Sequence, residues 1–428
     1  MTTKLDTDSA LRFANRYPEL GTGPIPSSPF VDPEYFEKEK EHIFKKMWIH
    51  VGRVEEIPNK GDFFVRDLPA CDANLIIVRS DDNKIKAFHN VCSHRQNSIV
   101  YENKGHTRRF FCKFHGWTYD LDGKLTNIPD RQAFGDLNED ELAMDEVSCD
   151  VWQGFIFINM QTNPAQTLHE FIEPMFGGMD GYPFDKLTAC YAWDCILDTN
   201  WKFALDANQE TYHVGFVHRR SVADSLGLNK EGLLHPIDGE CGEFHRRLSV
   251  AGNRDSIYGN PSAINTATSD EESTPKTKAN PRNAIGLEAL RLGRGGTVHE
   301  FRPEDLPKGL NWTNDPNWLF DINVIFPNFY MAVRPNYVQA YTFYPLSHDK
   351  TLFAARVYYP EMKTAGGRFY QEYMKVTLRD VLLEDMGTLE YTQRATNTQA
   401  KPWMYLQDNE IMVRHSNAVV ARLIDEEA

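Results

Sequence analysis

Two short Cys/His pairs constrain this chain more than any other feature. Cys92 and His94 form a Cys-x-His pair, Cys112 and His115 form a Cys-x-x-His pair, and seventeen residues separate the two pairs. A single cysteine is usually a small core residue, but two pairs at ligand spacing rarely arise by chance. The chain has seven cysteines and lacks an apolar leader, which argues against a disulfide scaffold and favours reduced thiols. The pairs therefore predict a metal site built from two loops.

The segment around these pairs has the pattern of a small β-domain. From Trp48 to about Met160, short runs rich in β-branched and aromatic residues alternate with Asp-Asp-Asn and Asp-Gly turns. Zinc sites usually pair like with like, as Cys-x-x-Cys and spaced His-His pairs. The mixed pairs instead favour a two-iron centre in which two thiolates hold one iron and two imidazoles hold the other. That centre is the Rieske [2Fe–2S] cluster.

The full pattern, Cys-x-His-x17-Cys-x-x-His, resembles the Rieske motif of the aromatic-ring-hydroxylating oxygenases. Arg95 also matches those relatives, and neither loop has the extra cysteine of respiratory Rieske proteins. Gly116 is expected to allow a tight backbone turn beside the cluster, and Trp117 is expected to shield it. The resemblance implies the following cluster ligands: Cys92, His94, Cys112 and His115.

A Rieske cluster cannot by itself oxidise a carbon substrate, so a second site is expected in the rest of the chain. The candidate lies in residues 200–218, of which 200–216 are expected to form one helix. Glu210 and His213 would share a face of that helix. His213 and His218 would diverge by about 140° on a regular helix. Their convergence on one metal requires a π-type widening or a helix end, which Gly215 makes feasible.

The order Asn-Trp-Lys, then Tyr-His and a second His, resembles the iron-binding segment of the α subunits in the same family. The third ligand of that family is an aspartate in a late helix, five residues before a glutamate, and Asp385 and Glu390 match it. Glu384 and Asp380 remain alternatives. The resemblance implies a mononuclear non-haem Fe(II) site with these ligands: His213, His218 and Asp385. Such a triad leaves positions open for O₂ and substrate.

Glu210 receives a separate role from the resemblance. The family has an acidic residue here that bridges the iron-ligand histidine to a Rieske histidine of the neighbouring subunit, which fixes the histidine tautomer. Most ring dioxygenases have Asp at this position, whereas Glu occurs in some relatives that act on quaternary amines. Asp206, one turn earlier, is expected to support Glu210 or to lie in its surroundings. The bridge implies a closed head-to-tail ring, either a homotrimer or, with a small β subunit, an α3β3 hexamer.

We expect an α+β protein with two domains. Residues 1–46 are expected to form a helical leader that packs on the catalytic domain, 47–160 the all-β Rieske domain, and 161–428 the catalytic domain. The resemblance implies that the catalytic domain has a helix-grip fold of the START/Bet v 1 type with a curved antiparallel sheet.

Three features mark the catalytic part of the chain. Strand patterns return from about Trp318, and a last helix is expected over 367–393. Residues 252–284 are rich in Ser, Thr, Asn, Pro and Gly and are expected to form an irregular, flexible insertion.

Composition argues against several classes of function. The net charge is −15, and the longest basic cluster, His245-Arg246-Arg247, is too short for the basic stripe of a nucleic-acid-binding protein. No stretch approaches the roughly 20 apolar residues of a membrane span, and the N-terminus lacks a secretory signal. We therefore expect a cytoplasmic protein with no nucleic-acid or membrane partner.

The resemblance implies a terminal oxygenase. It would take electrons from a reductase or ferredoxin through the Rieske cluster, activate O₂ at Fe(II), and hydroxylate or cis-dihydroxylate an organic, mainly aromatic, substrate in catabolism. No G-x-G-x-x-G motif follows a strand, so NAD(P)H chemistry would belong to the partner. The alternatives are a Rieske monooxygenase or demethylase of an aromatic ether, amine or quaternary ammonium compound, an electron-transfer protein, and a zinc-binding module. Arg334 is a candidate clamp for a substrate carboxylate.

Overall fold

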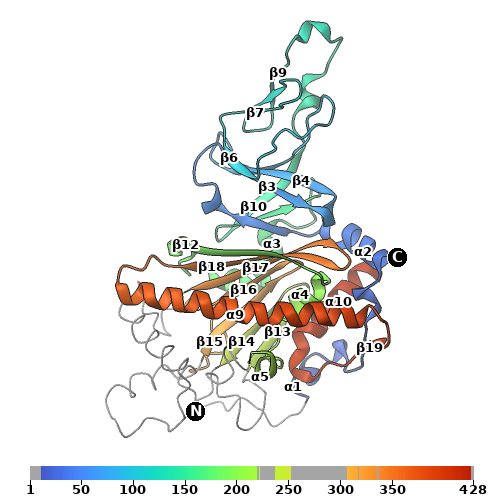
Figure 1. Cartoon of the computed structure of the whole chain (residues 1–428), viewed down its shortest axis with the longest axis vertical. Coiled ribbons are helices and arrows are strands. Elements are labelled where there is room, and N and C mark those ends of the chain that lie inside the picture. Colours follow the sequence, from blue (N-terminus) through green and yellow to red (C-terminus); the bar gives the residue numbers. More distant parts are fainter. Residues whose placement is uncertain are drawn as a thin grey trace.

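Two seven-stranded antiparallel sheets dominate the fold (Figure 1). The computed structural model describes residues 11–218, 221, 237–251, 306–316, 318–334 and 337–425. The insertion expected at 252–284 lies outside the described residues.

The first sheet and a small sheet beside it each contribute one Cys/His loop. The strands of the first sheet, in spatial order, are β2 (Ile49–Arg53), β11 (Phe155–Asn159), β10 (Glu146–Trp152), β5 (Ile85–His89), β4 (Ala73–Arg79), β3 (Asp62–Leu68) and β6 (Lys104–His106). The small sheet continues from it at the upper end of Figure 1 and consists of β7 (Phe110–Phe111), β8 (Thr118–Tyr119) and β9 (Leu125–Asn127). The first loop lies between β5 and β6, and the second lies between β7 and β8. The expected β-domain pattern is therefore confirmed.

The second sheet is the catalytic sheet, and its neighbouring strands are all antiparallel. Its strands, in spatial order, are β12 (Ala189–Leu197), β18 (Lys350–Tyr359), β17 (Val338–Ser347), β16 (Phe329–Val333), β15 (Trp318–Ile325), β14 (Arg246–Ala251) and β13 (Ile237–Cys241). The strands expected from about Trp318 are present, but β12, β13 and β14 come earlier in the chain and were not predicted from the sequence. The long helix α9 lies across this sheet in Figure 1.

The helices begin at recognisable caps. The α-helices of the described residues are α1 (Arg12–Arg16), α2 (Pro33–Glu39), α3 (Leu168–Phe176), α4 (Trp201–Asp206), α5 (Val214–Val217), α9 (Ala365–Thr396) and α10 (Ile411–Asp425). Asp32 accepts from the Glu34 N–H at 2.9 Å, and Thr364 accepts from the Gly367 N–H at 3.0 Å. The helix expected over 367–393 is present as the slightly longer α9, but it is not the last helix, because α10 follows it and was not predicted from the sequence.

The single helix predicted over 200–216 is wrong. The α-helix α4 ends at Asp206, residues 207–213 form turns, and a short helix, α5, begins at Val214. The carboxylate of Glu210 accepts hydrogen bonds from the backbone N–H groups of Tyr212 and His213. These N–H groups would donate to carbonyls in a continuous helix, so the side chain competes with helix propagation.

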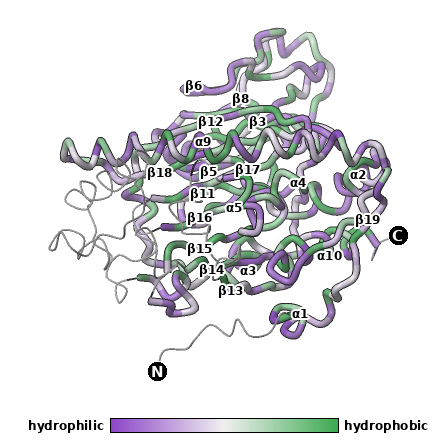
Figure 2. Tube along the Cα trace, turned by 60° about the horizontal axis from the view of Figure 1, so that its bottom comes forward, coloured by the Kyte–Doolittle hydropathy of each residue, from purple (hydrophilic) through white to green (hydrophobic). Residues whose placement is uncertain are grey.

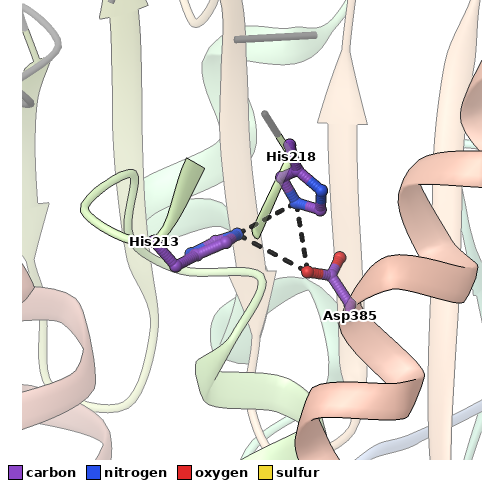
Figure 3. Close-up of side chains that lie close together, drawn as sticks. All are labelled: His213, His218 and Asp385. Atoms are coloured by element: carbon purple, nitrogen blue, oxygen red, sulfur yellow. Dashed lines mark hydrogen bonds and ion pairs between the residues drawn. The ribbon is translucent and has the colours of Figure 1, made fainter. Parts of the chain in front are cut away.

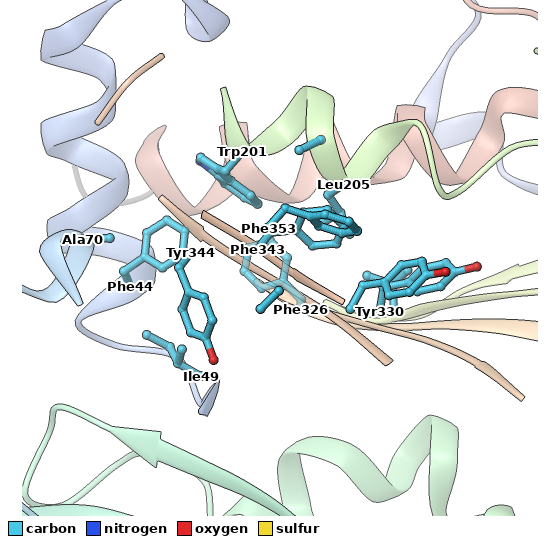
Figure 4. Close-up of a cluster of buried hydrophobic side chains, with 14 of the residues drawn as sticks. Phe44, Ile49, Ala70, Trp201, Leu205, Phe326, Tyr330, Phe343, Tyr344 and Phe353 are labelled. Atoms are coloured by element: carbon cyan, nitrogen blue, oxygen red, sulfur yellow. The ribbon is translucent and has the colours of Figure 1, made fainter. Parts of the chain in front are cut away.

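The two faces of the catalytic sheet are buried against different elements. One face packs on α3 and on the first sheet, where the rings of Phe155 and Phe157 lie 5.0 and 5.8 Å from that of Phe329. The other face packs on α4 and α9. Its core is shown in Figure 4 and includes Trp201, Leu205, Phe343 and Phe353. Figure 2 shows hydrophobic positions recurring along the central strands of the catalytic sheet, whereas β6, at the edge of the first sheet, is hydrophilic.

The N-terminal segment contacts the catalytic part of the chain. Arg16 forms an ion pair with Asp238 at 2.6 Å, and β1 (Ile25–Pro26) pairs with β19 (Trp403–Met404). Glu39, fully buried in α2, accepts from Trp201 Nε1 at 2.8 Å at the start of α4. None of the described helices combines the length and apolar character that crossing a bilayer requires.

Candidate metal centres

The two Cys/His loops have the same backbone pattern. In each loop the cysteine N–H donates to the carbonyl five residues on, and the N–H four residues on donates back to the cysteine carbonyl, all at 2.9 Å. The residue four positions after Cys92 is Gln96, and the residue four positions after Cys112 is Gly116. Both are left-handed, with φ of 57° and 77°. The tight turn expected at Gly116 is confirmed, and the loops form a matched pair.

The two thiols lie together in the core beneath the loops. Cys92 and Cys112 are each only 1% exposed. The Tyr119 hydroxyl donates to Cys92 Sγ at 3.4 Å, and the Asn97 amide donates to Cys112 Sγ at 3.8 Å. Hydrogen bonds to sulfur stabilise thiolate ligands and tune the potential of iron–sulfur clusters. The sulfur environment therefore fits a cluster.

The two imidazoles lie on the outer side of the same loops. The rings of His94 and His115 have centroids 4.4 Å apart, and Trp117 stacks on His94 at 5.1 Å, as expected for a shielding residue. His94 Nδ1 is buried without a hydrogen-bond partner, which suits a nitrogen that binds metal. Burial lowers the pKa of His94 and so favours the neutral, ligating form.

The arrangement of these four residues does not suit a single zinc ion. Tetrahedral coordination brings all four ligand atoms within about 4 Å of one another. Among the described residues, one set of His, Cys, Asp and Glu brings its ligand atoms within 4.8 Å, and that set lies elsewhere. The loops therefore fit a centre with two metal atoms better than the zinc alternative.

That compact set consists of His213, His218 and Asp385 (Figure 3). The two histidine Nε2 atoms are 3.1 Å apart, and Asp385 Oδ1 lies 3.1 Å from His218 Nε2 and 3.6 Å from His213 Nε2. Three ligands at about 2.1 Å on one face of an octahedral metal would be about 3 Å apart. The triangle has the size and donor set of a facial 2-His-1-carboxylate site.

Helix ends bring the two histidines together. His213 is the N-cap of the four-residue helix α5, and His218 is its C-cap. The sequence predicted that the two histidines converge through a π-type widening or a helix end, and both lie at ends of α5. The segment before α5, residues 207–213, is not helical. Asp385 comes from the middle of α9, which lies beside α5. The alternative residue Asp380 is not part of the triangle and pairs with Arg379 at 2.8 Å.

Known families match both parts of the chain. The Rieske [2Fe-2S] domain matches residues 47–144. The ring hydroxylating alpha subunit (catalytic domain) matches residues 184–426. The chain belongs to the ring-hydroxylating α-subunit family. The two domains imply a Rieske [2Fe–2S] cluster and a mononuclear iron, which the geometry of the loops and of the triad fits.

Relatives of this α subunit include dioxygenases and monooxygenases. The 2-aminobenzenesulfonate 2,3-dioxygenase subunit alpha of Alcaligenes sp is 34% identical over 214 residues, covering 49% of this chain and 53% of the relative. The glycine betaine monooxygenase oxygenase subunit of Chromohalobacter salexigens is 30% identical over 202 residues, covering 46% and 44%. The chain thus spans about half the length of the curated relatives that it matches.

Solved α subunits share the fold over nearly the whole chain. A quaternary ammonium Rieske monooxygenase superposes with a TM-score of 0.70 at 18% identity, covering 95% of this chain and 97% of the other. Naphthalene 1,2-dioxygenase from Rhodococcus sp., bound to indole, superposes with a TM-score of 0.67 at 20% identity, covering 100% and 99%. The α+β architecture expected from the sequence is confirmed.

Each histidine of the α-subunit triad has a carboxylate on its other ring nitrogen. Glu210 contacts His213 Nδ1, and Glu384 contacts His218 Nδ1 at 2.9 Å. Ser221 Oγ donates to Glu384 at 2.6 Å. Glu384, an alternative ligand in the sequence, therefore lies behind His218 rather than in the triangle. Its position in the sequence could have suggested a role next to Asp385, but its partner could not be read from spacing.

Asp206 does not contact Glu210 in this structure. Its carboxylate accepts from Gln209 Nε2 at 3.0 Å and from Asn417 Nδ2 at 3.4 Å. Gln209 in turn accepts from Arg246, whose Nη2 donates to Ser416 at 2.9 Å. Burial raises the pKa of Asp206 to about 7, although Arg246 opposes this effect. The sequence analysis missed this network because its members lie far apart along the chain.

Arg334 follows β16 at one end of the catalytic sheet. Its guanidinium carbon lies 3.7 Å from the centroid of the Phe320 ring and 5.4 Å from that of Tyr337. Among the described residues, the structure shows no ion pair or side-chain hydrogen bond for this arginine, and its Nε is buried without a partner.

Proposed function

We propose that this chain is the catalytic α subunit of a Rieske oxygenase and that it hydroxylates an organic substrate with O₂. The observation that carries the proposal is the facial triad in the same chain as a matched pair of Cys/His loops. The proposed cluster ligands are Cys92, His94, Cys112 and His115. The proposed iron ligands are His213, His218 and Asp385. The proposed domains are 1–46, 47–160 and 161–428.

The chain's own residues prepare the iron site. When bound, the cluster supplies single electrons and the iron supplies the centre at which O₂ is activated. Glu210 and Glu384 accept from the Nδ1 atoms of the two histidines, which fixes each tautomer and points Nε2 towards the other ligands. The two carboxylates therefore orient both rings so that their Nε2 atoms face the triangle.

The proposed assembly is a closed head-to-tail homotrimer. The Cys/His loops and α5 lie towards opposite ends of the molecule in Figure 1, so electrons would reach the iron from a neighbouring copy. The loop end exposes Phe111 and Phe114, which are 55% and 51% exposed. Next to Glu210, Tyr212 and Phe216 are 44% and 65% exposed. Exposed aromatic patches of this kind suit an interface, and Glu210 would bridge the two centres across it.

The external partners and the substrate class belong to the same proposal. A reductase or ferredoxin would supply the electrons, and a small β subunit would convert the trimer to α3β3. The named relatives include a dioxygenase of an aromatic sulfonate and monooxygenases of quaternary ammonium compounds. We favour an aromatic substrate, and a monooxygenase or demethylase is the second candidate. Turnover under ¹⁸O₂ separates them, since a dioxygenase product gains two labelled oxygens and a monooxygenase product gains one.

Replacing the first iron ligand tests the proposed activity. His213→Ala should abolish product formation with a surrogate reductase while the reduced protein keeps its Rieske paramagnetic resonance signal. An electron-transfer protein would instead lack oxygenated product in the wild type and would show unchanged electron transfer in the variant.

A further inference from the structure

A cluster of aromatic and polar side chains covers the end of the catalytic sheet beneath α9. Tyr330 pairs in register with Tyr341, and their rings stack with centroids 5.0 Å apart. Tyr337 and Tyr359 stack at 5.1 Å. Residues paired across antiparallel strands share a face, and Arg334 lies two residues beyond Ala332 and four beyond Tyr330 on that face. We call these four tyrosines and Arg334 the arginine–tyrosine cluster.

Two donors in the arginine–tyrosine cluster are buried without a partner. They are Arg334 Nε and the Tyr359 hydroxyl. Within the described residues no carboxylate lies within ion-pair distance of Arg334, whereas Arg247 and Arg356 of the same sheet pair with Glu240 and Asp194. Buried donors are rarely left unpaired in folded proteins, and the guanidinium of the half-buried Arg334 favours a negatively charged acceptor.

The arginine–tyrosine cluster also lies within electrostatic reach of the iron site. Burial raises the pKa of Tyr330, Arg334 lowers it, and Asp385 raises it further, so both charges act on the same phenol. Tyr330 and Tyr341 belong to the same hydrophobic core as Leu382 and Leu389, which flank Asp385 on α9. Tyr330 therefore lies within electrostatic range of both Arg334 and Asp385.

We infer that the substrate is an aromatic acid whose carboxylate or sulfonate binds Arg334 and the Tyr359 hydroxyl. This inference rests on the proposed oxygenase function, because it places the ring next to the triad. Aromatic clusters can also bind quaternary ammonium groups through their ring faces. Here the guanidinium of Arg334 already stacks on Phe320, so a second cation at this position is repelled.

The experiment compares acids with neutral analogues of the same shape. Isothermal titration calorimetry of the iron-loaded full chain would use benzoate, benzenesulfonate, benzamide and L-carnitine as probes. At least one aromatic acid should bind about 10- to 100-fold more tightly than benzamide, the range expected for one charge-assisted contact. Arg334→Gln should remove that preference and leave benzamide unchanged. Tyr359→Phe, a smaller change, should weaken the acid about 3- to 10-fold.

Arg356→Gln is the matched control, because Arg356 lies in the same sheet and is already paired with Asp194. It should leave the affinity for the acid unchanged. The inference is overturned if the acids bind no more tightly than benzamide, if their binding does not depend on Arg334 and Tyr359, or if L-carnitine alone binds. Oxygenation of a neutral arene without acid binding would overturn the inference but keep the proposed function. Arg334-dependent acid binding with no product under O₂ would support the inference but contradict the proposed function.

Discussion

At the scale of single residues, the iron site depends on the groups behind the ligands. Glu384 lies next to Asp385 in the sequence, yet the two carboxylates have different roles. Asp385 closes the triangle with the two Nε2 atoms, whereas Glu384 accepts from His218 Nδ1. Partners of this kind typically change metal affinity by about 10- to 100-fold when they are removed.

Glu384→Ala should therefore weaken iron binding at the triad by about 10- to 100-fold, and Glu384→Gln should weaken it less because the amide oxygen still accepts. Iron titration of the iron-depleted triad, with the visible absorbance of the cluster as an internal reference, measures the change. Asp380→Ala is the control on the same helix, since Asp380 pairs with Arg379 outside the triangle. Equal losses in the two alanine variants would contradict the role given to Glu384.

Asp206 makes the stability of the protein depend on pH. Its pKa in the folded state is about 7, above the ordinary value of 3.8. Between these values the folded state binds more protons than the unfolded state, so this group makes stability fall as pH rises from about 4 to about 7. Asp206→Asn should remove this decrease in the free energy of unfolding, which is about 1.4 kcal/mol per pH unit at most. Urea unfolding at pH 5, 6, 7 and 8 measures it. Parallel curves for the variant and the wild type would contradict the account.

At the scale of elements, the break between α4 and α5 builds the iron site. Alternating and helical patterns in the sequence predicted strands in the first sheet, the strands from β15 to β18 and the long α9, but they missed β12, β13, β14 and α10. They failed at 207–213, where the Glu210 carboxylate takes the backbone N–H groups of Tyr212 and His213. Such a side-chain contact overrides a local helix pattern and leaves no periodic signal. The third ligand was found through the resemblance, since nothing local marks Asp385 over Glu384.

Glu210 therefore has two separable effects. Glu210→Ala should let the helix of α4 continue and move His213, so iron content at the triad should fall together with activity. Glu210→Gln keeps an oxygen for the backbone donors but removes the charge, so the triad should keep its iron while reduction of the iron by the cluster slows. Metal analysis and single-turnover product formation separate the two. If both variants keep full iron and full activity, the break in the helix does not depend on this carboxylate.

At the scale of the whole molecule, the two centres lie towards opposite ends of one chain (Figure 1). The sequence predicts the four cluster ligands and the two iron-ligand histidines from short motifs, because their types and spacings are local, whereas Asp385 follows from the resemblance. It could not predict the network of Asp206, Arg246 and Ser416, because this network depends on contacts between distant strands and helices. For the same reason it could not predict the unpaired donors Arg334 Nε and the Tyr359 hydroxyl. The ring of subunits remains a proposal that rests on exposed aromatic residues at both ends.

A charge placed at the loop end should break that ring. Phe114→Glu should lower the oligomeric state in solution, because a buried unpaired carboxylate opposes the interface. Product formation should slow by at least about tenfold, while the Rieske signal stays intact. Phe369→Glu on α9 is the control, since Phe369 is similarly exposed at 44%. Analytical ultracentrifugation reports the assembly. A Phe114→Glu protein with wild-type size and rate would remove the proposed interface.

The iron content of the purified chain tests the account most directly. Elemental analysis of the wild type should find about three iron atoms per chain, two in the cluster and one at the triad, with no stoichiometric zinc. Asp385→Ala should retain about two. Zinc bound at Cys92 and Cys112 in place of iron, or an unchanged iron content in Asp385→Ala, would contradict the assignment of two iron centres to this chain.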